Sequence, residues 1–167
     1  QKTAYEIYQC DWSSDVCSSD LRFEVTNPGG HSSQPLKVNA IYQLAAALMR
    51  VGAYEFPIQF NDATRAYFAR MAAIKGGKVG EAIRALLKNP QDAAADAEVS
   101  KDKAWHSMLR TTCVATMAGA GHAVNALPQR ARANVNCRIF PGTTVDAVHQ
   151  TLIGIADDPA VTITPTL

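Results

Sequence analysis

Apolar and polar residues alternate in several short stretches of the chain, which is the spacing of a half-buried strand. The clearest stretches are residues 22–26, 129–139 and 161–164, and residues 111–117 add a β-branched run of the kind that favours strands. From Ala131 to Ile139 the odd positions carry small or apolar side chains, and from Arg130 to Arg138 the even positions carry arginines and asparagines. The pattern therefore predicts four strands, one of which has a packed face and a polar face.

Helical spacing takes over between these strands. Apolar stripes at positions three and four apart predict one helix over about 39–51 and another over about 145–155, where Thr143 and Asp146 resemble a capping box. Residues 62–109 hold further helical patterns and form a helical insertion. The order strand, helix, insertion, strand, strand, helix, strand predicts an α+β fold: a ferredoxin-like split βαβ sandwich with a four-stranded antiparallel sheet and two helices.

The composition of the chain argues against some classes of binding partner. The chain has 167 residues, 47% of them hydrophobic, and a net charge of +1, which predicts a single domain, residues 1–167, with a real core. The small charge and the lack of clustered strand aromatics argue against nucleic acid, and no apolar run approaches the ~20 residues of a membrane span. Gln1 is not an initiator residue, so we expect a piece of a longer protein.

The four cysteines, Cys10, Cys17, Cys113 and Cys137, lack C-x-x-C spacing and paired histidines. Neither a structural zinc site nor a redox motif is therefore indicated. Cys113 and Cys137 lie in strand-like runs, where small thiols are ordinary core residues. The redox compartment stays open.

The candidate chemistry lies at the corner 27–35, Asn-Pro-Gly-Gly-His-Ser-Ser-Gln-Pro, between the first strand and the first helix. Pro28 and the two glycines break the strand and allow positive φ or a close backbone approach. His31 can donate or accept a proton near neutral pH. The simplest interpretation is a turn with a surface histidine, and other motifs in the chain favour a functional role.

Three segments stand in one order: 27–33 (Asn-Pro-Gly-Gly-His-Ser-Ser), 122–129 (His-Ala-Val-Asn-Ala-Leu-Pro-Gln) and 136–142 (Asn-Cys-Arg-Ile-Phe-Pro-Gly). Together they resemble the dimerisation or lid domain of the zinc-dependent metallopeptidase and amidohydrolase family of carboxypeptidase G, aminoacylase and succinyl-diaminopimelate desuccinylase. The resemblance runs from about Arg22 to the end of the chain. It implies a parent enzyme whose catalytic domain, with its zinc ligands and general base, is absent here, so this fragment alone is expected to be inactive.

The resemblance also implies roles for particular residues in cleaving an amide of a peptide or an acyl-amino acid. His31 would reach the partner subunit's active site and donate a hydrogen bond to the oxyanion. Asn125 would contact the substrate or the attacked carbonyl, although an Asx turn before Pro128 explains it equally well. Arg138 would bind the substrate carboxylate, against the alternative of a solvated arginine on a strand face.

A homodimer follows from the same resemblance, because the uncharged strand 111–117 lacks the lysine or proline that protects an exposed edge, and in the family such an edge pairs with its twin. His122 takes no role from the resemblance, and Ser32 and Ser33 are expected to cap the helix or bond the turn. The alternative function is a free-standing ferredoxin-like module that binds or senses a small molecule.

One segment near the start does not fit this pattern. Asp11 to Leu21 resembles the translation of a common short-read sequencing adapter, so we interpret residues 10–21 as an artefact insertion without evolved function. Residues 3–9 then form the first half of a strand that Arg22 to Thr26 would complete.

Overall fold

The computed structural model describes residues 10–11 and 16–166, and the described chain divides into two compact units. A sheet unit contains the residues up to 54 and from 113 onward, and a helical unit contains Glu55–Thr112. The predicted α+β fold with a helical insertion is confirmed, and the predicted insertion 62–109 falls inside the helical unit. Residues 3–9, predicted as half a strand, lie outside the described residues.

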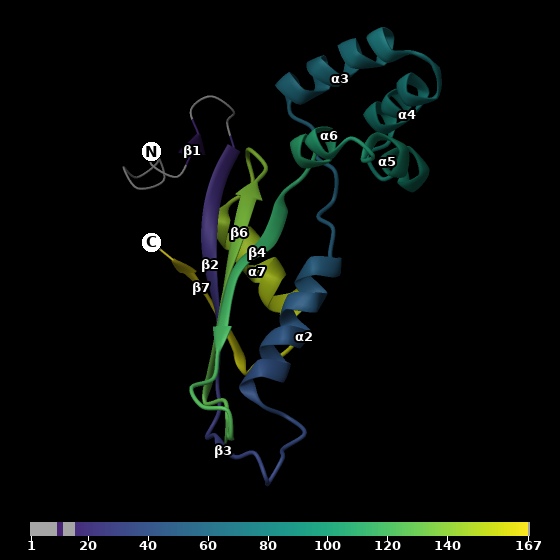
Figure 1. The fold of residues 1–167 in the computed structure, drawn as a ribbon. Helices are drawn as coiled ribbons and strands as arrows, with labels where there is room; N and C mark the ends of the chain where they lie inside the picture. The colour runs from purple at the N-terminus through teal and green to yellow at the C-terminus, as the bar shows by residue number, and fades with distance from the viewer. Residues whose placement is uncertain (1–9, 12–15, 167) are drawn as a thin grey trace. The chain divides into compact units, whose positions relative to one another are not determined.

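The sheet unit is built on one antiparallel sheet with the path β1-β2-β6-β4, and β7 pairs with β2 beside β1. Figure 1 shows these strands: β1 (Cys10–Asp11), β2 (Val16–Thr26), β4 (Thr112–Ala120), β6 (Arg130–Ile139) and β7 (Val161–Thr166). The two central strands, β2 and β6, run antiparallel with Phe23 opposite Ala133. β4 therefore ends the sheet on one side, which is the strand order of the predicted split βαβ fold.

Two helices, α2 (Ala40–Ala53) and α7 (Val145–Ala156), pack on the sheet and against each other. The side chains at alternate positions of β2 and β6, including Phe23 and Val135, are fully buried in the resulting core. The Asn39 side chain accepts a hydrogen bond from the Tyr42 amide and so begins α2. The N-cap of α7 is Thr144, one residue later than the predicted cap at Thr143, because the Thr144 hydroxyl accepts a hydrogen bond from the Ala147 amide.

The helical unit contains α3 (Asp62–Lys75), α4 (Gly77–Lys88), α5 (Ala93–Val99) and α6 (Lys103–Met108). Asn61 and Thr64 form a reciprocal capping box at the start of α3. Phe68 is 1% exposed and lies edge-on to three other rings, those of Phe60, Tyr67 and Trp105. Phe68 and Trp105 are buried in the core of this unit and Phe60 packs against it, whereas Tyr67 is 39% exposed.

Within residues 10–11 and 16–166, no helix is both long and apolar enough to cross a membrane. The sequence likewise contains no apolar run as long as a membrane span.

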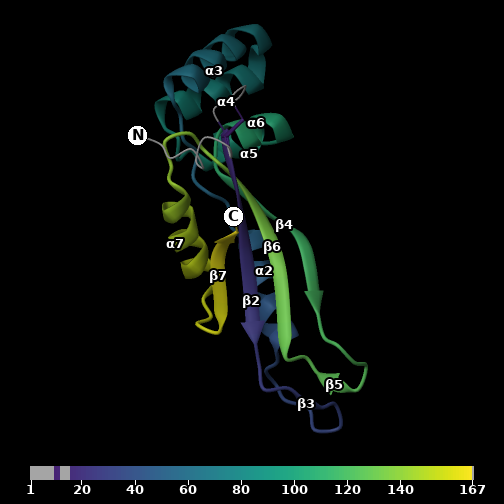
Figure 2. The same cartoon turned by 90° about the vertical axis from the view of Figure 1, so that its left-hand side faces the viewer.

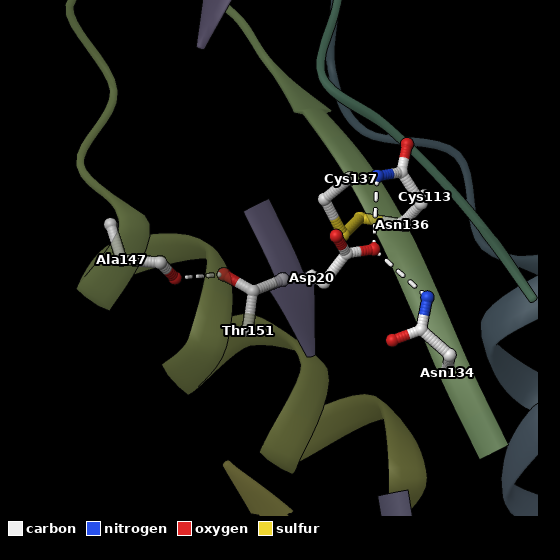
Figure 3. The surroundings of a disulfide bond; sticks show 7 residues. All are labelled: Asp20, Cys113, Asn134, Asn136, Cys137, Ala147 and Thr151. Carbon is white, nitrogen blue, oxygen red and sulfur yellow. Dashed lines mark hydrogen bonds between the residues drawn. A yellow bond between two sulfur atoms is a disulfide. The ribbon is translucent and has the colours of Figure 1, made fainter. Parts of the chain in front are cut away.

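The segment interpreted as an artefact insertion enters the sheet in part, because β2 begins at Val16. Leu21 is fully buried on the same face as Phe23, and Ser19 on that face is 3% exposed. On the opposite face, the Asp20 carboxylate accepts hydrogen bonds from the side-chain amides of Asn134 and Asn136 at 2.9 and 3.1 Å (Figure 3). These contacts describe how the residues pack, and the artefact interpretation stays a prediction.

Candidate functional site

The corner that carries His31 is held by a second, two-stranded sheet at one end of the sheet unit (Figure 2). Strand β3 (Gly30–His31) pairs antiparallel with β5 (Ala126–Leu127), so that His31 lies opposite Ala126. The Ser32 amide donates to the Asn125 carbonyl at 2.9 Å. Two of the three sequence motifs, far apart in the chain, are therefore joined directly by backbone hydrogen bonds.

The two glycines of the corner are required by its backbone. Gly29 has φ of +83° and Gly30 has φ of +151°, as the sequence predicted for this position. A Cβ atom on Gly29 would lie 2.6 Å from the Cγ atom of Gln129. The Gln129 side-chain amide in turn donates to the Pro28 carbonyl at 3.1 Å, and the Asn27 amide donates to the Gln129 carbonyl at 2.9 Å. The corner is thus a packed turn in which a side chain at Gly29 has no room.

The imidazole of His31 is oriented by Ser33. The Ser33 backbone amide donates to the Nδ1 atom of His31 at 3.2 Å, and the Ser33 hydroxyl lies 2.8 Å from the same nitrogen. Because a backbone N–H can only donate, Nδ1 is an acceptor, and the neutral ring carries its proton on Nε2. The side chain of His31 is exposed to solvent.

The other two predicted site residues lie in different places. Asn125 is exposed beside β5 and lies next to His31 through the Ser32–Asn125 hydrogen bond. Arg138 is exposed on β6, opposite Ser18, whereas Arg130 at the other end of β6 lies opposite Thr26 and next to the corner. Eight residues of strand separate the two arginines by about 26 Å. One protomer therefore brings His31 and Asn125 together and holds Arg138 apart.

The edge strand β4 offers an open surface. All nine of its residues are described, none has a buried side chain, and Val114 and Met117 are 60% and 71% exposed. The strand extends three residues beyond the predicted end at Met117. Its position at the end of the sheet leaves backbone groups on one side for pairing with another strand.

Among the described residues, no group of three or more His, Cys, Asp or Glu side chains could hold a metal ion. The His149 ring nitrogen, for example, is 2.7 Å from the Ile163 carbonyl in a contact between α7 and β7. The zinc that the resemblance implies has no ligand set in this part of the chain.

A disulfide bond joins Cys113 of β4 to Cys137 of β6 (Figure 3). The expectation of two separate core thiols was wrong, because the hairpin of β4 and β6 places these cysteines opposite each other. The Cα atoms are 4.1 Å apart, close to the ~4.5 Å of a non-hydrogen-bonded antiparallel pair. The sequence carries no local signal for this bond, because it depends on the register between β4 and β6.

The described residues thus combine a split βαβ sheet that has an open edge strand with an exposed histidine on a glycine corner. The model of the family described as peptidase dimerisation domain matches residues 18–164, and the chain belongs to this family.

Relatives share this domain within much longer proteins. The human N-fatty-acyl-amino acid synthase/hydrolase PM20D1 is 31% identical over 150 residues, which is 89% of this chain and 29% of that protein. A Dictyostelium discoideum protein named probable carboxypeptidase S-like 2 is 27% identical over 146 residues, or 86% of this chain and 27% of that protein. The chain thus spans less than a third of the length of either relative.

Solved structures show the same fold at low sequence identity. Human carnosine dipeptidase 1 matches 91% of this chain and 36% of that chain with a TM-score of 0.51 and 13% identity. An M20 family metallo-carboxypeptidase from Sulfolobus solfataricus matches 92% of this chain and 45% of that chain with a TM-score of 0.50 and 17% identity. At such identities the likeness concerns the fold alone.

Proposed function

We propose that this chain is the dimerisation domain of a metal-dependent hydrolase that cleaves amide bonds of N-acyl-amino acids or peptides. In that enzyme the domain pairs with its twin and extends His31 into the partner subunit's active site. The substrate class rests on the relatives, whose names include an N-fatty-acyl-amino acid hydrolase and a carboxypeptidase. The zinc ligands belong to the parent's catalytic domain.

The observation that carries the role of His31 is its hydrogen bonding. With Nδ1 occupied by the Ser33 amide, the neutral ring presents an Nε2–H donor to whatever lies outside the corner. Such a donor suits the oxyanion that forms when water adds to an amide carbonyl. Removing one oxyanion-hole donor from an enzyme typically costs roughly 100- to 1000-fold in rate.

The sheet geometry supports a composite site. The Thr112 end of β4 lies beside the Arg138 end of β6, since Cys113 is bonded to Cys137, and the Ala120 end lies beside Arg130 and the corner. A two-fold axis through the middle of β4 would pair two copies antiparallel and so reverse one sheet against the other. Arg138 of one subunit would then lie at the same end of the joined sheet as His31 and Asn125 of its twin, with about three strand spacings, or ~14 Å, between Arg138 and the twin's β6.

Subunit mixing in the intact parent enzyme tests this arrangement. His31→Ala is expected to lower kcat roughly 100- to 1000-fold with bound metal unchanged, and Arg138→Ala is expected to raise KM for substrates with a free carboxylate. Lys37→Ala, an exposed change in the loop after His31, is the control and should leave turnover unchanged. His31→Gln keeps a side-chain N–H donor and should recover part of the rate.

Activity is then measured at a substrate concentration well below KM, where each variant alone is slow. When the two impaired variants are mixed and exchanged, half of the dimers carry one of each subunit. One site in each such dimer then has both intact residues, so about a quarter of wild-type activity should return. No recovery in mixed dimers would show that both residues act within one subunit, and normal turnover of His31→Ala would remove His31 from the mechanism.

A further inference from the structure

The edge strand β4 has little besides its neighbour to hold it in place. None of its nine side chains is buried, so burial of apolar area hardly anchors it. Besides the backbone ladder, the structure gives it a hydrogen bond between Thr116 and the Asn134 side chain at 2.9 Å, and the disulfide from Cys113 to Cys137. Cys137 is fully buried in the central strand β6, which makes it a firm attachment point.

The position of the disulfide is informative. Cys113 is the second residue of β4 and comes directly after the helical unit Glu55–Thr112. The strand thus begins where a long excursion of the chain ends, and a preceding excursion adds conformational freedom that pairing must remove. A covalent bond at this point fixes the beginning and the register of β4 on the sheet.

We propose that the Cys113–Cys137 disulfide is the anchor of the dimerisation edge, so that pairing of two copies through β4 depends on oxidation. This inference rests on the proposed dimer. When the bond is closed, β4 is already in the extended form that a second copy must pair with, and little ordering is left to oppose association. When it is open, β4 can separate from β6 and must be ordered again before the twin binds.

The redox step is a thiol–disulfide exchange. A dithiol reductant gives two electrons and two protons to the bond, leaving Cys113 and Cys137 as thiols and the reductant as a disulfide. The reverse exchange with a disulfide-bearing oxidant closes the bond. The dimer edge would therefore be maintained in oxidising compartments, where such bonds persist, and loosened by the dithiol systems of a reducing one.

Sedimentation equilibrium of the 167-residue chain tests the inference. Cys10→Ser and Cys17→Ser form the background, so that Cys113 and Cys137 are the remaining cysteines. The dimer Kd is measured for the oxidised protein and again in dithiothreitol. We expect reduction to weaken dimerisation about ten- to a hundredfold, which is less than the roughly 300-fold that the full constraint of closing a loop of this size would give.

Hydrogen exchange distinguishes a local effect from general unfolding. Amides of β4 should lose protection on reduction while those of β2 keep theirs. In the matched control, Cys113→Ser with Cys137→Ser, dithiothreitol should change neither the Kd nor the exchange. An equal Kd in the oxidised and reduced proteins would overturn the redox dependence alone, whereas an oxidised protein that is monomeric at every concentration would overturn the proposed dimer as well.

Discussion

Arg110 should hold the helical unit together, and replacing it with methionine tests this. Its side chain is 2% exposed, and its guanidinium donates to the Asp96 carboxylate and, at 3.0 Å, to the Ser100 hydroxyl. It also donates to Glu55 at 3.1 Å and to the His106 carbonyl at 3.3 Å. The residue therefore connects the start of the unit at Glu55 with α5 and α6.

The expected loss of unfolding free energy follows from how exposed the two carboxylates bound by Arg110 are. Removing one member of a buried ion pair costs about 3–5 kcal/mol when the remaining charge stays dry. Asp96 is 26% exposed and Glu55 is 65% exposed, so both carboxylates can regain water when Arg110 is lost. We therefore expect Arg110→Met to lower the free energy of unfolding of the helical unit by about 2 kcal/mol, below the buried-pair range.

Trp105 provides the assay, because it is 7% exposed within the core of this unit. Urea unfolding is followed by its fluorescence in a Trp12→Phe background, which isolates the helical unit from the rest of a chain that need not unfold in one step. Arg70→Met is the matched control, since Arg70 is exposed on α3. It should change the unfolding free energy by less than about 0.5 kcal/mol.

The pH dependence supplies a second test. Burial alone would raise the pKa of Asp96, but hydrogen bonds from Arg110 and Ser100 and the charge of Arg110 outweigh it and leave the pKa below its ordinary value. A lowered folded-state pKa contributes stability above the ordinary carboxyl pKa, and this stability is lost as the pH falls through the folded value. The difference in unfolding free energy between the wild-type protein and Arg110→Met should thus become smaller below about pH 4. Equal stability at pH 7, or a gap that persists in acid, would refute the reasoning.

Two further predictions concern the corner and the edge strand. Gly29→Ala should destabilise the sheet unit by about 1–3 kcal/mol in thermal unfolding and shift the NMR resonances of His31, because φ of +83° and the Gln129 contact exclude a Cβ atom. Gly52→Ala is the control and should cause neither change, because a Cβ atom there would have no neighbour within 4 Å. Met117→Lys should make the chain monomeric in sedimentation by placing a charge on the exposed edge strand, while Thr164→Lys on the opposite edge strand β7 should leave the dimer intact.

The fold could be predicted because its sheet obeys a simple pattern. Strand β6 is buried at every odd position from Ala131 to Ile139, so the alternation in the sequence is the alternation in the structure. The end of β4 was harder to place, since residues 118–120, Ala-Gly-Ala, have weak strand propensity and are held by pairing with β6. α5 appears only as a weak helix or a loop in the sequence, and its Asp92 cap forms in the folded unit.

The site could be predicted in part, for a different reason. The glycines of the corner and His31 lie within one continuous segment, so the sequence motif was enough to predict the turn and the position of the histidine. The hydrogen bonds of Ser33 to His31 depend on the exact turn, and the separation of Arg138 from His31 depends on which end of β6 meets the corner. Tertiary pairing also joins Cys113 to Cys137, which short-range spacing does not encode.

Residues 16–21 form part of β2, but only some of their side chains suit a buried central strand. β2 requires apolar side chains at alternate positions, and Leu21 meets that requirement beside Phe23. Ser19 does not, because it places a hydroxyl on the same core-facing side at 3% exposure, opposite Cys137. An evolved central strand would be expected to carry an apolar residue there. The mismatch favours the interpretation of residues 10–21 as foreign sequence, which predicts that an independent determination of the gene will lack them; their presence in it would make Ser19 and Asp20 native members of β2.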